Sequence, residues 1–173
     1  MLCRPPFHHV NSIPSVGGTY LLLLKLSVHL AIRIDKRGKR IVVLEPGFYV
    51  YVGSGWGPGG LRARLKRHLM DRRRRLHWHI DRLLASGYAR PVCVVYSVGC
   101  NAEKRIARVL STVFDPIPGF GSSDDKESAS HLFRLAASSC SGHVMCYLLV
   151  SCLTRSCGAA CIAGGDVDGE SCE

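Results

Sequence analysis

The sequence predicts an α+β fold in which a small mixed, largely antiparallel β-sheet is flanked by helices. Short apolar runs alternate with Gly-, Pro- and Asp-containing turns, as they do in chains of hairpins. A leucine recurs at every fourth position from Leu61 to Leu69, which lines one face of a helix. Together these patterns place strands first, then helices, with further strands later in the chain.

The expected strands are 19–28, 31–34, 39–44, 48–52, 91–98 and 131–135. The second and third flank Asp35-Lys36-Arg37-Gly38, a turn signal, and are predicted to form a hairpin. In the fourth, alternation puts Tyr49 and Tyr51 on one face and the other apolar side chains on the opposite face. The expected helices are 59–71, 76–86 and 101–114, with Asn101 as the N-cap of the last.

Three regions are expected along the 173 residues: a loose N-terminal segment (1–16), one folded domain (17–135) and a Cys-rich C-terminal tail (136–173). The apolar run 144–153 is too short to cross a membrane, and we expect a buried strand or a poorly ordered tail there. The nine cysteines are an odd number, and the N-terminus has no signal-peptide core. We therefore expect reduced thiols and a cytoplasmic location.

Positive charge is concentrated in one stretch of a chain whose formal net charge is +10. Eight Lys and Arg residues and a single acid, Asp71, lie between Arg62 and Arg75. Such a cluster predicts a polyanionic partner, most commonly nucleic acid, with an anionic membrane surface as the weaker alternative. The residues expected to contact nucleic acid are Arg62, Lys66, Arg67, Arg72, Arg73, Arg74, Arg75 and Trp78. For Trp78 the alternative is a packed ring rather than one that stacks on a base.

A glycine-rich turn, 53–60, precedes the first predicted helix. Glycine lets backbone N–H groups approach a ligand closely, and a helix N-terminus favours phosphate. Phosphate binding at this turn is therefore one hypothesis. The alternative is an ordinary strand-to-helix turn, and the absence of a terminal Gly-Lys-Ser/Thr argues against a nucleotide-binding P-loop.

Three side chains stand out by their helical positions. Arg64 and His68 fall beside the leucine stripe, at the rim between core and solvent, although a solvated basic face would give the same pattern. Glu103 falls on the apolar face of its helix, where a carboxylate needs a partner such as a hard metal ion. A helix-dipole contact or an arginine is the alternative for Glu103. His77 and His79 cannot converge on one metal from a helix, so we expect one at a cleft and one in a structural role.

In combination, these residues resemble the GIY-YIG nuclease superfamily. Gly18-Thr19-Tyr20 and Tyr51-Val52-Gly53 stand where that family has its two tripeptides, followed by an arginine and a histidine one turn apart and by a later glutamate. The phrases YVYVGSGWGPGGLRARLKRHL, LHWHID, PGFGSSD and SHLF are closest to a small single-domain branch of unassigned function, known mainly from archaea. The resemblance covers 17–135. It departs from the superfamily at Thr19 and in the spacing of thirty-one positions from Tyr20 to Tyr51, a spacing that is usual in the branch. It departs from the branch in having no cysteine in 124–129.

The resemblance implies a metal-dependent endonuclease that hydrolyses phosphodiester bonds in DNA, in repair or recombination, with RNA as an alternative substrate. It implies Mg²⁺ or Mn²⁺ held by Glu103. The catalytic residues would be Tyr20, Tyr51, Arg64, His68 and His77. A tyrosine acting as general base would need a pKa depressed by nearby cations.

Two other functions stay open at this point. One is a nucleic-acid-binding module on the same fold with little or no catalysis. The other is a basic RNA- or ribosome-associated protein, which would use Arg72–Arg75 but would not need Glu103.

Overall fold

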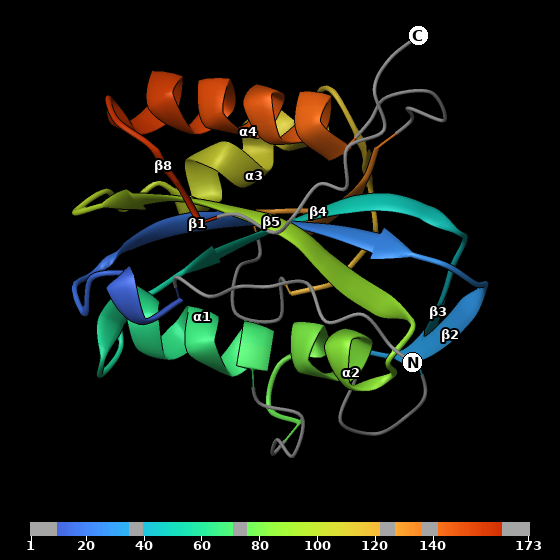
Figure 1. The fold of residues 1–173 in the computed structure, drawn as a ribbon. Coiled ribbons are helices and arrows are strands. Elements are labelled where there is room, and N and C mark those ends of the chain that lie inside the picture. The colour runs from blue at the N-terminus through green and yellow to red at the C-terminus, as the bar shows by residue number, and fades with distance from the viewer. Residues whose placement is uncertain (1–9, 35–39, 71–75, 122–126, 136–141, 164–173) are drawn as a thin grey trace, which may run out of the picture.

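The computed structural model describes residues 10–34, 40–70, 76–121, 127–135 and 142–163. Its centre is a six-stranded sheet with the order β6-β7-β4-β1-β5-β8, in which every neighbouring pair is antiparallel (Figure 1). The strands are β1 (Gly18–Leu26), β4 (Gly47–Ser54), β5 (Ala89–Val98), β6 (Asp115–Pro116), β7 (Leu132–Arg134) and β8 (Cys161–Ala163). The predicted α+β class is confirmed.

Helices cover both faces of this sheet (Figure 1). α1 (Gly60–Met70) and α2 (His79–Ala85) lie on one face, and α3 (Glu103–Ser111) and α4 (Gly142–Cys157) on the other. β1 is the central strand, and its leucines alternate between the two cores: Leu22 and Leu24 pack on the α1 side, Leu21 and Leu23 on the α3 side. Burial on both faces explains why this strand is a continuous apolar run.

The same alternation is seen in β4. Tyr49 and Tyr51 point into the core beneath α1 and α2, and Val50 and Val52 into the core beneath α3 and α4. The predicted sidedness of the two tyrosines is confirmed, and it sets the position of the site.

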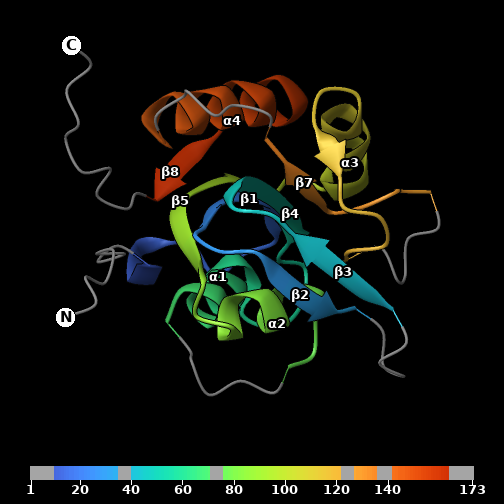
Figure 2. The ribbon, with the colours of Figure 1, turned by 90° about the vertical axis from the view of Figure 1, so that its right-hand side faces the viewer.

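The residues between β1 and β4 form a separate two-stranded sheet of β2 (Leu30–Arg33) and β3 (Ile41–Leu44), seen beside α2 in Figure 2. This is the predicted hairpin, although its turn at 35–38 lies outside the described residues. β1 and β4 are already paired as far as Leu26 and Gly47. The hairpin therefore begins only after the β1–β4 pairing has ended.

The segment before β1 is packed rather than loose over its described part. It contains a short 3₁₀ helix, η1 (Val10–Ser12), and the side chains of Val10 and Ile13 are buried. Its carbonyl groups cap α1, since Leu61 N–H donates to Val16 O and Arg62 N–H to Pro14 O. These amides are satisfied within the protein, so the hypothesis that they bind phosphate is not supported.

The expectation for the C-terminal region is wrong. Residues 142–157 form α4 instead of a strand or a poorly ordered tail, and Met145, Cys146, Leu149 and Leu153 are buried in the core on the α3 side. The chain then adds β8 to the edge of β5. The folded unit therefore continues well beyond Leu135, because this face of the sheet needs α4 as well as α3 to cover its apolar side chains.

Disulfide bonds join Cys93 to Cys146 and Cys100 to Cys157. For these four residues the prediction of reduced thiols is wrong. One bond joins α4 to β5, and the other joins α4 to the loop after β5. Both cysteine pairs therefore lie where the helix packs on the sheet. Disulfides persist in oxidising surroundings. The cytoplasmic location stays a prediction, which the redox state of these cysteines in cells would test.

Element boundaries differ from the predicted ones at both ends of helices; α3, for example, ends at Ser111 rather than at residue 114. α2 begins at His79 rather than at residue 76, and the N-cap of α3 is Ala102 rather than Asn101. Within the described residues, no helix is long and apolar enough to cross a membrane.

Candidate active site

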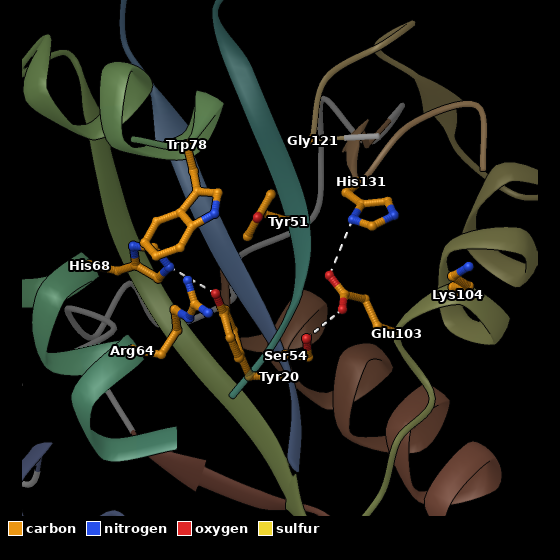
Figure 3. A pocket seen from close by; sticks show the side chains of 10 residues that line it. All are labelled: Tyr20, Tyr51, Ser54, Arg64, His68, Trp78, Glu103, Lys104, Gly121 and His131. Carbon is orange, nitrogen blue, oxygen red and sulfur yellow. Dashed lines mark hydrogen bonds and ion pairs between the residues drawn. The ribbon is translucent and has the colours of Figure 1, made fainter. Parts of the chain in front are cut away.

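A cavity of about 250 Å³ lies at the edge of β4, where the two helical layers approach each other. Figure 3 shows α1 and the loop before α2 supplying Arg64, His68 and Trp78 on one side, with Glu103, Ser54 and His131 on the other. The tyrosines lie between them. The full lining is Tyr20, Tyr51, Ser54, Arg64, His68, Trp78, Glu103, Lys104, Gly121 and His131. Six residues predicted to be functional, Trp78 among them, therefore share one cavity with four further residues.

The two tyrosines come from neighbouring strands despite their separation in sequence. The ring centroids of Tyr20 and Tyr51 are 6.3 Å apart, and each ring also contacts the imidazole of His68. The Tyr20 hydroxyl is 2.8 Å from His68 Nε2, a hydrogen bond inside the protein. Tyr20 and His68 thus form a bonded pair, with Tyr51 beside it.

Burial raises the pKa of both tyrosines above the ordinary value. For Tyr20 the nearby Tyr51 raises the pKa further, and Arg64 lowers it only in part. For Tyr51 the carboxylate of Glu103 adds to the effect of burial. The depressed pKa that a tyrosinate base would need is therefore not found, and both hydroxyl groups stay protonated at neutral pH.

Gly53 makes room for the Tyr20 ring. The two residues are paired across β1 and β4, and a Cβ built at Gly53 would lie 2.3 Å from the Tyr20 hydroxyl oxygen. Any larger residue would push this hydroxyl away from His68. The glycine of the Tyr-Val-Gly tripeptide is thus required by the site itself.

Arg64 is held against Trp78. The guanidinium carbon of Arg64 lies 3.9 Å from the indole centroid, and that of Arg67 lies 4.5 Å from it. Cation–π contacts of this kind orient a guanidinium while leaving its N–H groups free to bind an anion. Trp78 is half-buried and packed against these two side chains. Because the ring also lines the cavity, its stacking on a base stays a prediction.

Glu103 begins α3 and is held by donors on both carboxylate oxygens. The Ser54 hydroxyl donates to Oε2 at 2.5 Å, and His131 Nδ1 is 3.2 Å from Oε1. Burial alone would raise the pKa of Glu103, but His131, Ser54 and Arg64 outweigh it and hold that pKa below its ordinary value. The carboxylate is therefore charged at neutral pH.

Thr19 fixes the start of α3. Its hydroxyl donates to Cys100 O at 2.7 Å and accepts from Ala102 N–H at 3.0 Å. The residue that departs from the family's Gly-Ile-Tyr thus ties β1 to the first turn of the helix that carries Glu103.

Glu103 has the chemistry of a Mg²⁺ or Mn²⁺ ligand. Mg²⁺ is commonly held by one or two carboxylates, with water and phosphate oxygens completing the shell. Among the described residues no group of three or more His, Cys, Asp or Glu forms a closed metal cage. A single ionised carboxylate facing a cavity, opposite Arg64, fits that open kind of site.

Several predicted contact residues lie elsewhere. His77 is exposed, with its ring edge-on to Trp78, and it does not line the cavity. The guanidinium of Arg62 donates to Ile13 O, and that of Arg67 to Asp81. Lys66 is exposed on α1. Arg72–Arg75 lie outside the described residues.

Four functional candidates were not found from the sequence: Ser54, Asp81, Lys104 and His131. Ser54 and His131 lie in phrases that carry the family resemblance, GSG and SHLF, but nothing in their spacing connects them to Glu103. His79, the second histidine of the pair, is structural: its Nδ1 accepts from Gly121 N–H, and its ring packs on Phe120.

A family model described as "Domain of unknown function DUF123" matches residues 19–151. The chain belongs to this DUF123 family. The match includes every residue that lines the cavity and ends within α4. No curated protein and no solved structure is significantly similar to the chain.

Proposed function

We propose that this DUF123 protein is a divalent-metal-dependent endonuclease of the GIY-YIG type that hydrolyses phosphodiester bonds in DNA. One observation carries the proposal: a single cavity is lined by Tyr20, Tyr51, Arg64, His68 and Glu103, which come from two strands and two helices of the chain. A fold that only bound nucleic acid through its basic surface would have no need of this arrangement.

The residues divide the reaction between them. Arg64 binds the scissile phosphate and stabilises the charge that develops on its oxygens. The Tyr20 hydroxyl accepts a hydrogen bond from the attacking water and donates its own proton to His68 Nε2. Because Tyr20 keeps a raised pKa, it transfers the proton in a concerted step and does not become a free tyrosinate. Tyr51 lines the cavity beside this pair and orients the water or the phosphate.

The step balances as a hydrolysis. The water oxygen bonds to phosphorus, its proton passes through Tyr20 to His68, and the phosphorus–oxygen bond to the leaving strand breaks. The leaving oxygen takes up a proton from solvent. A Mg²⁺ or Mn²⁺ ion on Glu103 would neutralise negative charge on the phosphate and the leaving group.

The deciding experiment incubates duplex, nicked, branched and single-stranded DNA with the full chain and Mg²⁺, Mn²⁺ or EDTA. Cleavage is expected with either metal and not with EDTA. Glu103→Gln and Arg64→Ala should each lower the cleavage rate by at least about 10²-fold while circular dichroism shows a folded protein. DNA binding by Glu103→Gln should hold or improve, because a negative charge leaves the cavity.

Two surface variants serve as matched controls. Glu127→Gln and Arg108→Ala remove a carboxylate and a guanidinium from an exposed ion pair that does not line the cavity. Both should cut like wild type. Equal cleavage by wild type and Glu103→Gln would refute the metal assignment. A wild-type protein that binds DNA but cuts none of the substrates would favour a binding module instead.

A further inference from the structure

Asp81, on α2, is a charged side chain with no exposed surface. It does not line the cavity, and the reaction described above gives it no role. Burying a carboxylate without partners costs folding free energy, so the partners of Asp81 indicate its function.

One oxygen of Asp81 is fixed by three donors. Oδ2 accepts from Arg67 Nη2 at 2.7 Å and from the backbone N–H groups of His77 and Trp78 at 3.1 Å each. Burial alone would raise the pKa of Asp81, but these hydrogen bonds and the neighbouring His68 hold that pKa below its ordinary value. The group is therefore an ionised carboxylate whose orientation is set by Oδ2.

The other oxygen is directed at the catalytic histidine. Oδ1 lies 3.7 Å from His68 Nδ1, which is within ion-pair range but longer than a hydrogen bond, and both atoms are buried. On the far side of the same imidazole, Nε2 is 2.8 Å from the Tyr20 hydroxyl. Asp81, His68 and Tyr20 thus form a line that ends in the cavity. The three residues lie on β1, α1 and α2, far apart in the sequence, so sequence analysis could not show that they are in contact.

We propose that Asp81 is the positioning residue of the site: it holds His68 as the tautomer with hydrogen on Nδ1. The partner of one imidazole nitrogen decides which nitrogen carries the proton. With Nδ1–H directed at the carboxylate, Nε2 is left as the acceptor that Tyr20 needs. When His68 takes the proton, Asp81 lies beside the imidazolium and stabilises it. The predicted effect on the cleavage rate rests on the proposed nuclease function, whereas the predicted tautomer of His68 is independent of it.

The same carboxylate reaches Arg64 by a second route. Arg67 donates to Asp81 and shares the indole of Trp78 with Arg64, and the backbone N–H of Trp78 also donates to Asp81. One buried group therefore supports both the proton-accepting pair and the phosphate-binding guanidinium.

Asp81→Asn separates this role from simple capping of α2. The three donors to Oδ2 require the carbonyl oxygen of the new amide to take that place. Its NH₂ group then faces His68 Nδ1 as a donor. The imidazole should respond by moving its hydrogen to Nε2, which can no longer accept a proton from Tyr20.

The test is ¹⁵N NMR of the full chain with labelled histidine at about pH 8.5, where an ordinary histidine is neutral. The His68 signals are identified by their loss in His68→Gln. Wild type should show a protonated Nδ1 and an unprotonated Nε2, and Asp81→Asn the reverse. Glu45→Gln, which removes a carboxylate from the ion pair with Arg134, should keep the wild-type pattern. Hydrogen on Nε2 in wild type would overturn the proposal, even if Asp81→Asn did not fold.

Kinetics gives a second readout. If the protein cleaves DNA, Asp81→Asn should lower kcat at least about tenfold with KM nearly unchanged, since the amide oxygen keeps the contacts that hold Arg67 and Trp78 beside Arg64. An unchanged kcat in a folded variant would refute the positioning role. If wild type cleaves nothing, the nuclease proposal fails, and the tautomer measurement still decides whether Asp81 positions His68.

Discussion

At the scale of single residues, the site depends on close contacts that leave no space for a larger side chain. The hydroxyl of Tyr20 occupies the space above the Gly53 backbone and reaches His68 from there. Motif residues that look interchangeable in a sequence thus have different tasks. Tyr20 bonds the histidine, Gly53 provides room, and Thr19 anchors α3.

Gly53→Ala should damage the site and the fold together. The added methyl group would lie 2.3 Å from the Tyr20 hydroxyl, so the ring must move and the bond to His68 breaks. We expect a loss of about 1–3 kcal/mol in unfolding free energy and a fall in cleavage rate of at least about tenfold. Urea denaturation and the DNA cleavage assay measure the two effects. Gly57→Ala, where a Cβ would meet nothing within 4 Å, is the control and should change neither.

Asp81 should also govern acid stability. Its pKa is lower in the folded protein than in the unfolded chain, where it is about 3.9. The stabilisation is therefore complete above that value and is lost as the pH falls through the folded-state pKa. Asp81→Asn should be less stable than wild type at pH 7, by about 1–3 kcal/mol. Its stability should fall less steeply between about pH 5 and pH 2. Denaturation series across this range would decide, and identical slopes would count against a lowered pKa.

At the scale of elements, prediction worked where one periodicity dominated. The leucines of α1 and the alternation in β4 gave the right structure, because local spacing and tertiary burial agree there. It failed at α4, whose Val, Tyr and Cys residues favour a strand by composition. The positions buried on α4 (Met145, Cys146, Leu149 and Leu153) do have helical spacing. Only the position of the apolar sheet face that these residues cover distinguishes a helix from a strand here.

A chain that ends after Ser138 should therefore fail to fold. Four side chains of α4 are buried against the sheet, and removing the helix would expose the apolar face that they cover. Each contributes about 1.5–3 kcal/mol, and together they rival the total stability of a domain, about 5–15 kcal/mol. A chain ending after Ala163, which keeps every described element, should retain the wild-type melting temperature. A cooperative thermal transition in the shorter chain would show that α4 is an addition to a fold already stable without it.

At the scale of the whole molecule, the site assembles from segments between β1 and β7. The sequence resemblance indicated five of the residues lining the cavity. It could not indicate His131 or Asp81, because their roles depend on the loop after α3 approaching Glu103 and on α2 lying beside α1. For the basic residues, contact with nucleic acid stays a prediction. Arg62 and Arg67 have the charge to bind DNA, yet their guanidinium groups bond inside the protein.

The charge distribution predicts how binding depends on salt. Replacing Arg72–Arg75 with serine should flatten the plot of log K against log[salt], because each lost phosphate contact lowers the slope by about 0.9. Fluorescence anisotropy with labelled DNA at several salt concentrations would measure it. Arg155→Ser, an exposed change on α4 across the sheet from α1, should leave the slope unchanged. An unaltered slope in the four-arginine variant would place the contact surface elsewhere.

The edges of the central sheet affect the tendency of this protein to aggregate at high concentration. Within the described residues, one edge ends in the two-residue strand β6, whose second residue is Pro116. At the other edge β8 pairs with β5 only over Val94–Tyr96. The stretch of β5 that β8 does not reach carries Arg90, Pro91 and a register shift. A short edge strand, prolines, a charge and an irregular strand all discourage another chain from adding itself to a sheet. Concentrated solutions of the protein should therefore resist edge-to-edge aggregation.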